Sequence, residues 1–64
     1  MNIHSAFELY TQQSWHQALD ICKNILAENP QDIDANHISG VCEKNLKNFD
    51  QSRALLETAC KLAP

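Results

Sequence analysis

We predict an all-α fold of two stacked antiparallel helix-turn-helix hairpins, a short α-α superhelix, from three observations. Pro30 and Pro64 stand 34 residues apart, each closing a helix-forming stretch, and stacking helix-turn-helix repeats have this length. Apolar residues recur at helical spacing. Only two or three residues separate the predicted helices within each hairpin, so these helices must run antiparallel. We therefore expect a single domain over residues 1–64, with repeat 1 at about 1–30 and repeat 2 at about 32–64.

The two halves of the chain are similar when residues 1–30 are laid over residues 35–64. Identical residues occur at Asn2/Asn36, Ser5/Ser39, Gln17/Gln51 and Pro30/Pro64. Size or polarity is also kept at Ala6/Gly40, Phe7/Val41, Trp15/Phe49, Ala18/Ser52, Ile21/Leu55 and Cys22/Leu56. About two identities are expected by chance, so residue class is the better evidence for a repeat.

The second helix of each hairpin is predicted from a capping box and an apolar stripe. Ser14 with Gln17, and Asn48 with Gln51, have the spacing at which a cap and the third helical residue exchange hydrogen bonds. A helix at about 15–28 follows from the stripe Trp15, Ala18, Leu19, Cys22, Ile25 and Leu26. The stripe recurs at Phe49, Ser52, Leu56, Ala59 and Cys60. The prolines end these helices, because proline cannot donate a backbone hydrogen bond and disfavours helical geometry in the preceding residue.

The first helix of each hairpin is predicted at about 3–12 and 33–46. Asn2 and Asp32 are the candidate N-caps. Gly40 is the only glycine and costs about 1 kcal/mol of helix stability relative to alanine. We therefore expect it to be a packing residue that lets another helix approach closely.

Composition excludes several classes of function. The net charge is −3, with five basic residues scattered along the chain, so neither nucleic acid nor an anionic membrane is an expected partner. No stretch has the length of apolar sequence that spans a bilayer, and no signal peptide is present. Cys22, Cys42 and Cys60 are odd in number, lack C-x-x-C spacing and fall at predicted buried positions. A reducing compartment and a cytoplasmic location are expected.

The sequence contains no recognisable active site, so we predict a non-enzymatic segment with no catalytic, cofactor-binding or metal-binding residues. His4, His16 and His37 lack the converging spacing of a metal site. His4 and Glu8 are interpreted as a surface pair one helical turn apart. A solvated outer surface is expected for Asp20, Lys23, Glu28, Glu43, Lys47, Arg53, Glu57 and Lys61.

The chain resembles the tetratricopeptide repeat (TPR) family over nearly its whole length. The pattern of that family is W-x2-L-G-x2-Y, then A-x3-F, then P. Matching residues are Ala6, Trp15, Ala18 and Pro30 in the first copy, and Gly40, Phe49, Ala59 and Pro64 in the second. The chain departs from the pattern at Asn2, Ser5, Asn36, Ser39, Glu43 and Ser52.

The resemblance implies a scaffold that binds other proteins. The first helix of each hairpin would line the concave face of a superhelix and hold a partner peptide or helix there. The partner-binding residues would be Ile3, Phe7, Tyr10, His37, Val41 and Lys44. Family members that clamp a C-terminal carboxylate use Lys and Asn on this face, where this chain has Ile3, Phe7 and Ile38. A clamp of that kind is therefore not expected. The competing interpretation is that Ile3 and Phe7 are ordinary core residues.

The ends of the array suggest two further hypotheses. Glu8 and Gln12 make the first hairpin a polar-faced start, with Met1 expected to be a true N-terminus. Nothing polar caps the other end, where we expect Leu55, Cys60 and Leu62 to stay uncovered. The chain would then be the N-terminal part of a longer protein, such as a bacterial enzyme. Residues 34–41 resemble the repeats that precede glycosyltransferase and sulfotransferase domains in such enzymes. Otherwise it would form a homo-oligomer through the uncovered C-terminal hairpin.

Overall fold

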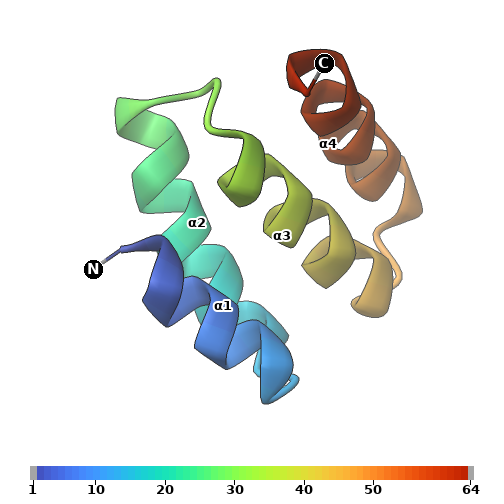
Figure 1. Cartoon of the computed structure of the whole chain (residues 1–64). Coiled ribbons are helices and arrows are strands. Elements are labelled where there is room, and N and C mark those ends of the chain that lie inside the picture. The colour runs from blue at the N-terminus through green and yellow to red at the C-terminus, as the bar shows by residue number, and fades with distance from the viewer. Residues whose placement is uncertain (1, 64) are drawn as a thin grey trace.

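The computed structural model of the protein describes residues 2–63 and contains four helices with no strand in that range. The helices are α1 (Ile3–Thr11), α2 (Trp15–Glu28), α3 (Ile33–Asn45) and α4 (Phe49–Leu62) (Figure 1). The predicted all-α fold is confirmed, and α1, α2 and α3 each lie within about one residue of their expected bounds. Expectations that concern Met1 and Pro64 lie outside the described residues.

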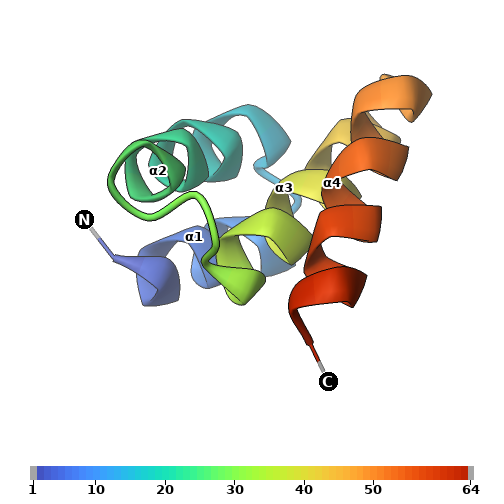
Figure 2. The same ribbon diagram turned by 90° about the horizontal axis from the view of Figure 1, so that it is seen from above.

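The helices form two antiparallel hairpins that pack side by side. Helix α2 folds back along α1, α3 lies against both, and α4 folds back along α3 (Figures 1 and 2). Among the described residues, α4 contacts α3 and makes no comparable contact with the first hairpin. The order of contacts is that of consecutive helices stacking on one another, as the repeat predicts.

The core lies mainly where α3 meets the first hairpin. Its buried members are small or medium in size, namely Ala6, Ala18, Leu19, Ile21, Cys22, Ala35, Ile38 and Cys42. Ala6, Ala18, Cys22, Ala35 and Cys42 have no exposed surface. Small side chains at the contacts let the helix backbones approach closely. The core is therefore filled by closely packed helices rather than by large side chains.

Gly40 is a packing residue, as predicted. A Cβ atom at this position would lie 2.6 Å from Cγ and 2.7 Å from Cδ2 of Leu56 on α4. The backbone of α4 is also close, since its Leu56 nitrogen would be 3.3 Å away. Gly40 therefore sets how closely α3 and α4 approach each other.

Two of the four predicted N-caps are confirmed and two are wrong. Asn2 accepts a hydrogen bond from the backbone nitrogen of Ser5, and Asp32 accepts one from Ala35. The side chains of Ser14 and Asn48 make no capping bond, so the predicted capping boxes do not form. The reason is the backbone: the bonded caps are extended, with ψ of 178° and 117°. At Ser14 and Asn48 ψ is only 70° and 71°.

The tight turn inside each hairpin explains that backbone. Gln13 and Lys47, 34 residues apart, have left-handed φ values of 62° and 68°. After each of them the backbone forms a hydrogen bond to the residue five positions earlier, from the Ser14 nitrogen to the Leu9 carbonyl and from the Asn48 nitrogen to the Glu43 carbonyl, both at 2.8 Å. This is the Schellman pattern that ends a helix. The 34-residue repeat is therefore present in the backbone as well as in the sequence.

Several burial predictions differ from the structure. Phe49 is 61% accessible and Cys60 is exposed, because the described residues cover α4 on one side only. For Cys60 this contradicts the burial predicted from helical periodicity and agrees with the expectation of an uncovered C-terminal hairpin. Leu55 and Leu62, expected to be uncovered, are half-buried. Glu43 was expected on the solvated surface and is 6% accessible, because its position on α3 faces the interval between α2 and α4.

Candidate functional site

The candidate site is a groove between α1 and α3, on the side of the molecule formed by the first helix of each hairpin. Its volume is about 600 Å³. It is lined by Ile3, His4, Phe7, Tyr10, Asp34, His37 and Ile38. We call it the α1–α3 groove.

Helical spacing brings the apolar lining together. Ile3, Phe7 and Tyr10 are four and three residues apart, so they lie on one face of α1. The Phe7 and Tyr10 rings are tilted against each other with centroids 5.9 Å apart, and Tyr10 stands 5.8 Å from Trp15. Trp15 and Tyr10 pack against the core, whereas Phe7 is 54% exposed. The core thus holds an aromatic row whose outer member is open to a partner.

Apart from Ile38, the remaining lining residues are polar. His4 comes from α1, and Asp34 and His37 come from the first part of α3. No lysine or arginine lines this groove in the described part of the chain. The arrangement suits an apolar side chain held on the aromatic row with polar backbone or side-chain groups on either side.

The structure brings four of the six predicted partner-binding residues to this groove, namely Ile3, Phe7, Tyr10 and His37. Val41 is half-buried on the same helix as His37 and does not line the groove. Lys44 is exposed and lies on a different surface, shared with α4.

That second surface, the α3–α4 face, is lined by Lys44, Phe49, Ser52, Arg53, Leu56, Glu57 and Cys60. Its hollow measures about 500 Å³. Residues 34 positions earlier are Tyr10, Trp15, Ala18, Leu19, Cys22, Lys23 and Leu26. All of these except Lys23 belong to the core or pack against it. The α3–α4 face is thus the repeat equivalent of the surface that receives α3 in the first hairpin, but it is more polar and uncovered.

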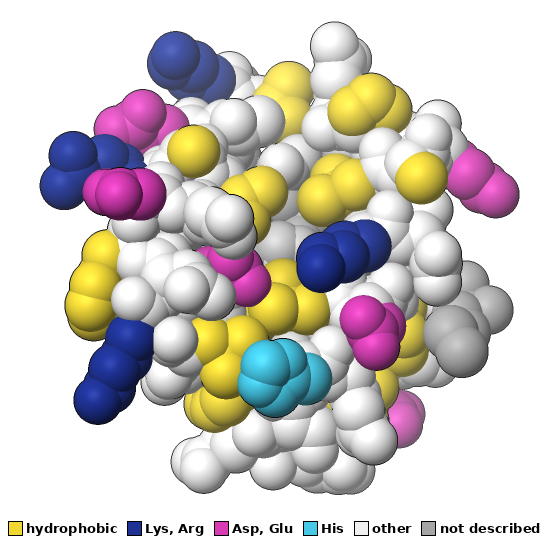
Figure 3. All heavy atoms as spheres, turned by 180° about the vertical axis from the view of Figure 1, so that it is seen from behind, with side chains coloured by type: hydrophobic (Ala, Val, Ile, Leu, Met, Phe, Trp, Pro, Cys, Tyr) yellow, Lys and Arg dark blue, Asp and Glu magenta, His cyan; other side chains and the backbone are white. Residues whose placement is uncertain are grey.

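A third surface was not foreseen from the sequence. It is a small groove of about 140 Å³ on the opposite side from the α1–α3 groove, over α3 and between α2 and α4. We call it the α2–α4 groove. Figure 3 shows this side of the molecule, where hydrophobic side chains gather in a hollow with acidic and basic atoms beside it. The only sequence signal was Glu43 in the place where the repeat pattern has tyrosine.

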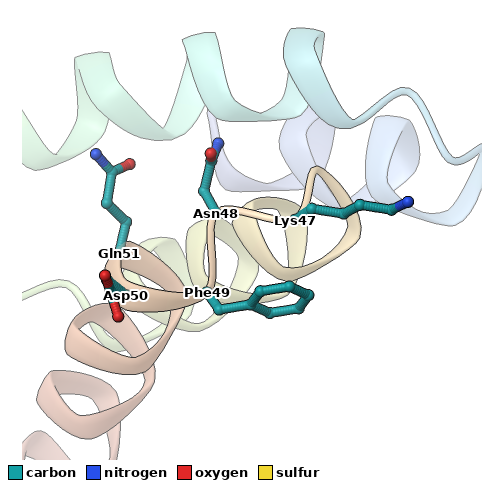
Figure 4. Close-up of a pocket in the computed structure, with 5 residues that line it drawn as sticks. All are labelled: Lys47, Asn48, Phe49, Asp50 and Gln51. Atoms are coloured by element: carbon teal, nitrogen blue, oxygen red, sulfur yellow. The ribbon is translucent and has the colours of Figure 1, made fainter.

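A shallower recess at the turn between α3 and α4 is formed by five consecutive residues, Lys47 to Gln51. Their side chains do not converge in Figure 4: Lys47 and Phe49 point one way, and Asn48 and Gln51 another. This recess offers no set of groups directed at one ligand.

The reactive side chains give no catalytic arrangement in the described range. No group of three or more His, Cys, Asp or Glu residues within residues 2–63 could hold a metal ion. Burial raises the pKa of the Cys22 thiol, an effect that the neighbouring Ser39 hydroxyl partly offsets. Burial also raises the pKa of Cys42 to about 11, which keeps it protonated and unreactive at neutral pH. None of the four helices is long and apolar enough to cross a membrane.

The comparison with protein families agrees with the hairpin architecture. A family model described as tetratricopeptide repeat matches residues 9–64, which is most of the chain. No curated protein and no solved structure matches it. The match covers all of α2, α3 and α4, and the helices form two helix-turn-helix units. The chain therefore belongs to the tetratricopeptide repeat family.

Proposed function

We propose that the protein is an interaction module that binds a partner peptide or helix in the α1–α3 groove. The observation that carries the proposal is Phe7, a large apolar side chain that is 54% exposed at the mouth of a mainly apolar groove. The Tyr10 ring packs against the Phe7 ring, and Trp15 packs against Tyr10. Aromatic side chains in such positions dominate the binding energy of many interfaces. His37, Val41 and Lys44 extend the proposed contact surface along α3.

A groove of about 600 Å³ takes a few side chains of a partner rather than a folded domain. We expect a partner segment that inserts one apolar anchor beside Phe7 and hydrogen-bonds to Asp34, His4 or His37 at the groove's polar positions. The cytoplasmic location belongs to the same proposal and is supported by the three free thiols, which suit a reducing compartment.

The test is selection of peptides from a random displayed library on the immobilised protein, followed by affinity measurement with the enriched peptides. Phe7→Glu places a charge in the groove and is expected to weaken binding by at least about tenfold. Phe49→Glu is the matched control, since Phe49 is an equally exposed phenylalanine on the α3–α4 face. Circular dichroism checks that both variants keep their helices. Peptides that bind Phe7→Glu as well as the wild type would refute the proposal.

A second function, self-association through the α3–α4 face, is favoured by a specific observation. Phe49 and Leu56 lie on this face together with the opposite charges Arg53 and Glu57, one helical turn apart on α4. If two copies of α4 pack antiparallel about a twofold axis, Arg53 of each copy lies opposite Glu57 of the other. A twofold contact requires such a self-complementary surface.

Light scattering coupled to size exclusion tests this second function. The wild type is expected to form a dimer at high concentration. In this experiment Phe49→Glu is the test variant and Phe7→Glu is the control. Phe49→Glu should be monomeric, whereas Phe7→Glu should still dimerise. A wild-type protein that stays monomeric and folded at the highest concentration excludes self-association and leaves the peptide-binding function untouched.

A further inference from the structure

Glu43 is a buried acid without a partner. Its residue is 6% accessible, and no hydrogen bond or ion pair among the described residues reaches its carboxylate. A carboxylate on a largely buried residue with no partner can accept hydrogen bonds from a cation. Because Glu43 lines the α2–α4 groove, this groove is where a compensating positive charge can approach it.

A second polar group at the same groove is also unsatisfied. Ser39 is 2% accessible and lines the groove, and its hydroxyl oxygen has no hydrogen-bond partner among the described residues. Its neighbour is the Cys22 thiol, which is a weak hydrogen-bonding group. Ser39 and Glu43 are one turn apart on α3, so both side chains lie on one helix face. Two acceptors without a partner therefore lie on the face of α3 that lines the groove.

The walls of the groove are mostly apolar, with Gln51 of α4 as a polar member. Leu19 and Leu26 on α2 and Leu55 on α4 flank the two polar residues. The volume of about 140 Å³ is that of about four or five water molecules, which suits one extended side chain. A divalent cation needs several oxygen ligands, and no cluster of metal-binding side chains exists among the described residues.

We infer that the α2–α4 groove binds a primary alkylammonium group, as carried by a lysine side chain, with the Glu43 carboxylate as its counter-ion. The aliphatic stem lies between the leucines, as lysine stems commonly lie on apolar surface. The ammonium group donates to Glu43, and the Ser39 hydroxyl is the second acceptor within the same turn of α3. The site is separate from the α1–α3 groove and stands independently of the peptide-binding function.

Lys23 lies at the edge of the groove and places a positive charge beside the amine site. It is exposed and lines the groove from α2, but its ammonium group forms no ion pair with Glu43 in the structure. As a like charge it opposes entry of an added amine. Removing the charge of Lys23 should therefore strengthen amine binding, whereas removing that of Glu43 should abolish it.

The experiment is an NMR titration of the full chain at low salt with two probes, n-butylammonium and Nα-acetyl-lysine methylamide. Saturable shifts are expected at the backbone amides around Glu43, Ser39 and Leu55. The Nε-acetylated form of the lysine probe, which has lost its charge, should bind at least about tenfold more weakly. Saturation by n-butylammonium alone would retain the amine site and assign it to small free amines rather than to lysine side chains.

Variants complete the test. Glu43→Gln should lose the saturable shifts, and Lys23→Gln should bind more tightly than the wild type. Glu57→Gln is the matched control, because it removes an exposed carboxylate of α4 that lies outside the groove. Phe7→Glu should leave amine binding unchanged, which separates this site from the proposed peptide groove.

Thermal unfolding without ligand distinguishes a binding residue from a structural one. Glu43→Gln keeps the side-chain shape and removes a charge that no described residue pairs, so its melting temperature should equal or exceed that of the wild type. A lower melting temperature would mean that Glu43 already has a structural partner, and this would overturn the inference. Absence of saturable shifts with both amines, or equal binding by Glu43→Gln, would overturn it as well.

Discussion

The hydroxyl of Ser52 on α4 donates a buried hydrogen bond of 2.7 Å to the carbonyl of Gly40 on α3. Gly40 also has no side chain, and a Cβ atom at this position would lie 2.6 Å from the Leu56 side chain. One helical turn of α4 thus bonds to the α3 backbone and packs directly on it. This close approach, rather than a large apolar core, joins the two helices of the second hairpin.

Gly40→Ala is expected to destabilise the protein by about 1 kcal/mol. Alanine improves helix propensity by about 1 kcal/mol, but overpacking at a close contact typically costs about 1–3 kcal/mol. The loss should therefore exceed the gain. Chemical denaturation followed by circular dichroism measures the change in free energy of unfolding.

A double-mutant cycle with Leu56→Ala identifies the cause. Truncating Leu56 removes the two atoms that the new methyl group would meet most closely, so Gly40→Ala should then be neutral or stabilise the protein by up to about 1 kcal/mol through helix propensity. A coupling free energy of about 1–2 kcal/mol between the two positions is expected. If Gly40→Ala stabilises the protein in both backgrounds, the contact with Leu56 does not restrict the side chain at position 40.

The N-caps provide a matched pair of substitutions. Asp32→Ala should lower the free energy of unfolding by about 1 kcal/mol, because the Asp32 carboxylate accepts a bond of 2.8 Å from the Ala35 nitrogen. Ser14→Ala should change it by less than about 0.5 kcal/mol, since the Ser14 side chain makes no capping bond. Equal losses in the two variants would contradict this assignment of the caps. The measurement is again equilibrium denaturation.

Left-handed turns at Gln13 and Lys47 predict stabilising substitutions. Glycine adopts φ values near 60° without the steric cost that other residues carry. Gln13→Gly and Lys47→Gly should each raise the free energy of unfolding by up to about 1 kcal/mol. Gln12→Gly is the control and should not stabilise, because the φ of Gln12 is −85°. Melting temperatures that fall in the two turn variants would argue against strain at these positions.

Helix positions could be read from the sequence because they depend on local rules. Helical periodicity and Pro30 predicted the bounds of α2, and Asn2 and Asp32 cap their helices as side chains of their type do. The Ser14 and Asn48 caps failed because the backbone of the preceding turn determines whether a side chain can reach the helix. Nothing in the local residue pattern revealed the left-handed turns, which glycine usually signals.

Burial was harder to predict, because it depends on neighbours distant in sequence. Helical periodicity predicted a buried Cys60 and an exposed surface position for Glu43, and both are the reverse in the structure. Only the expectation of an uncovered C-terminal hairpin agrees with the exposure of Cys60. Cys60 lies on the side of α4 that no described helix covers, and Glu43 lies between α2 and α4. The aromatic members of the α1–α3 groove were predictable from their spacing on α1. The small α2–α4 groove was not, since three helices contribute to it.

Buried thiols predict how stability depends on pH. The pKa of Cys42 is raised by burial from 9.0 to about 11, with the nearby Cys22 and Glu43 adding to the rise. Between pH 9.0 and about 11 the folded state therefore holds a proton that the unfolded state has lost. This contribution to stability is complete below pH 9.0 and disappears as the pH rises through the folded value, by at most about 1.4 kcal/mol per pH unit.

Urea denaturation across this pH range should show the decline in the wild type and in Cys60→Ala, whose thiol is exposed. Cys42→Ala should show a shallower decline. Identical slopes in all three proteins would show that the Cys42 thiol does not control the alkaline loss of stability.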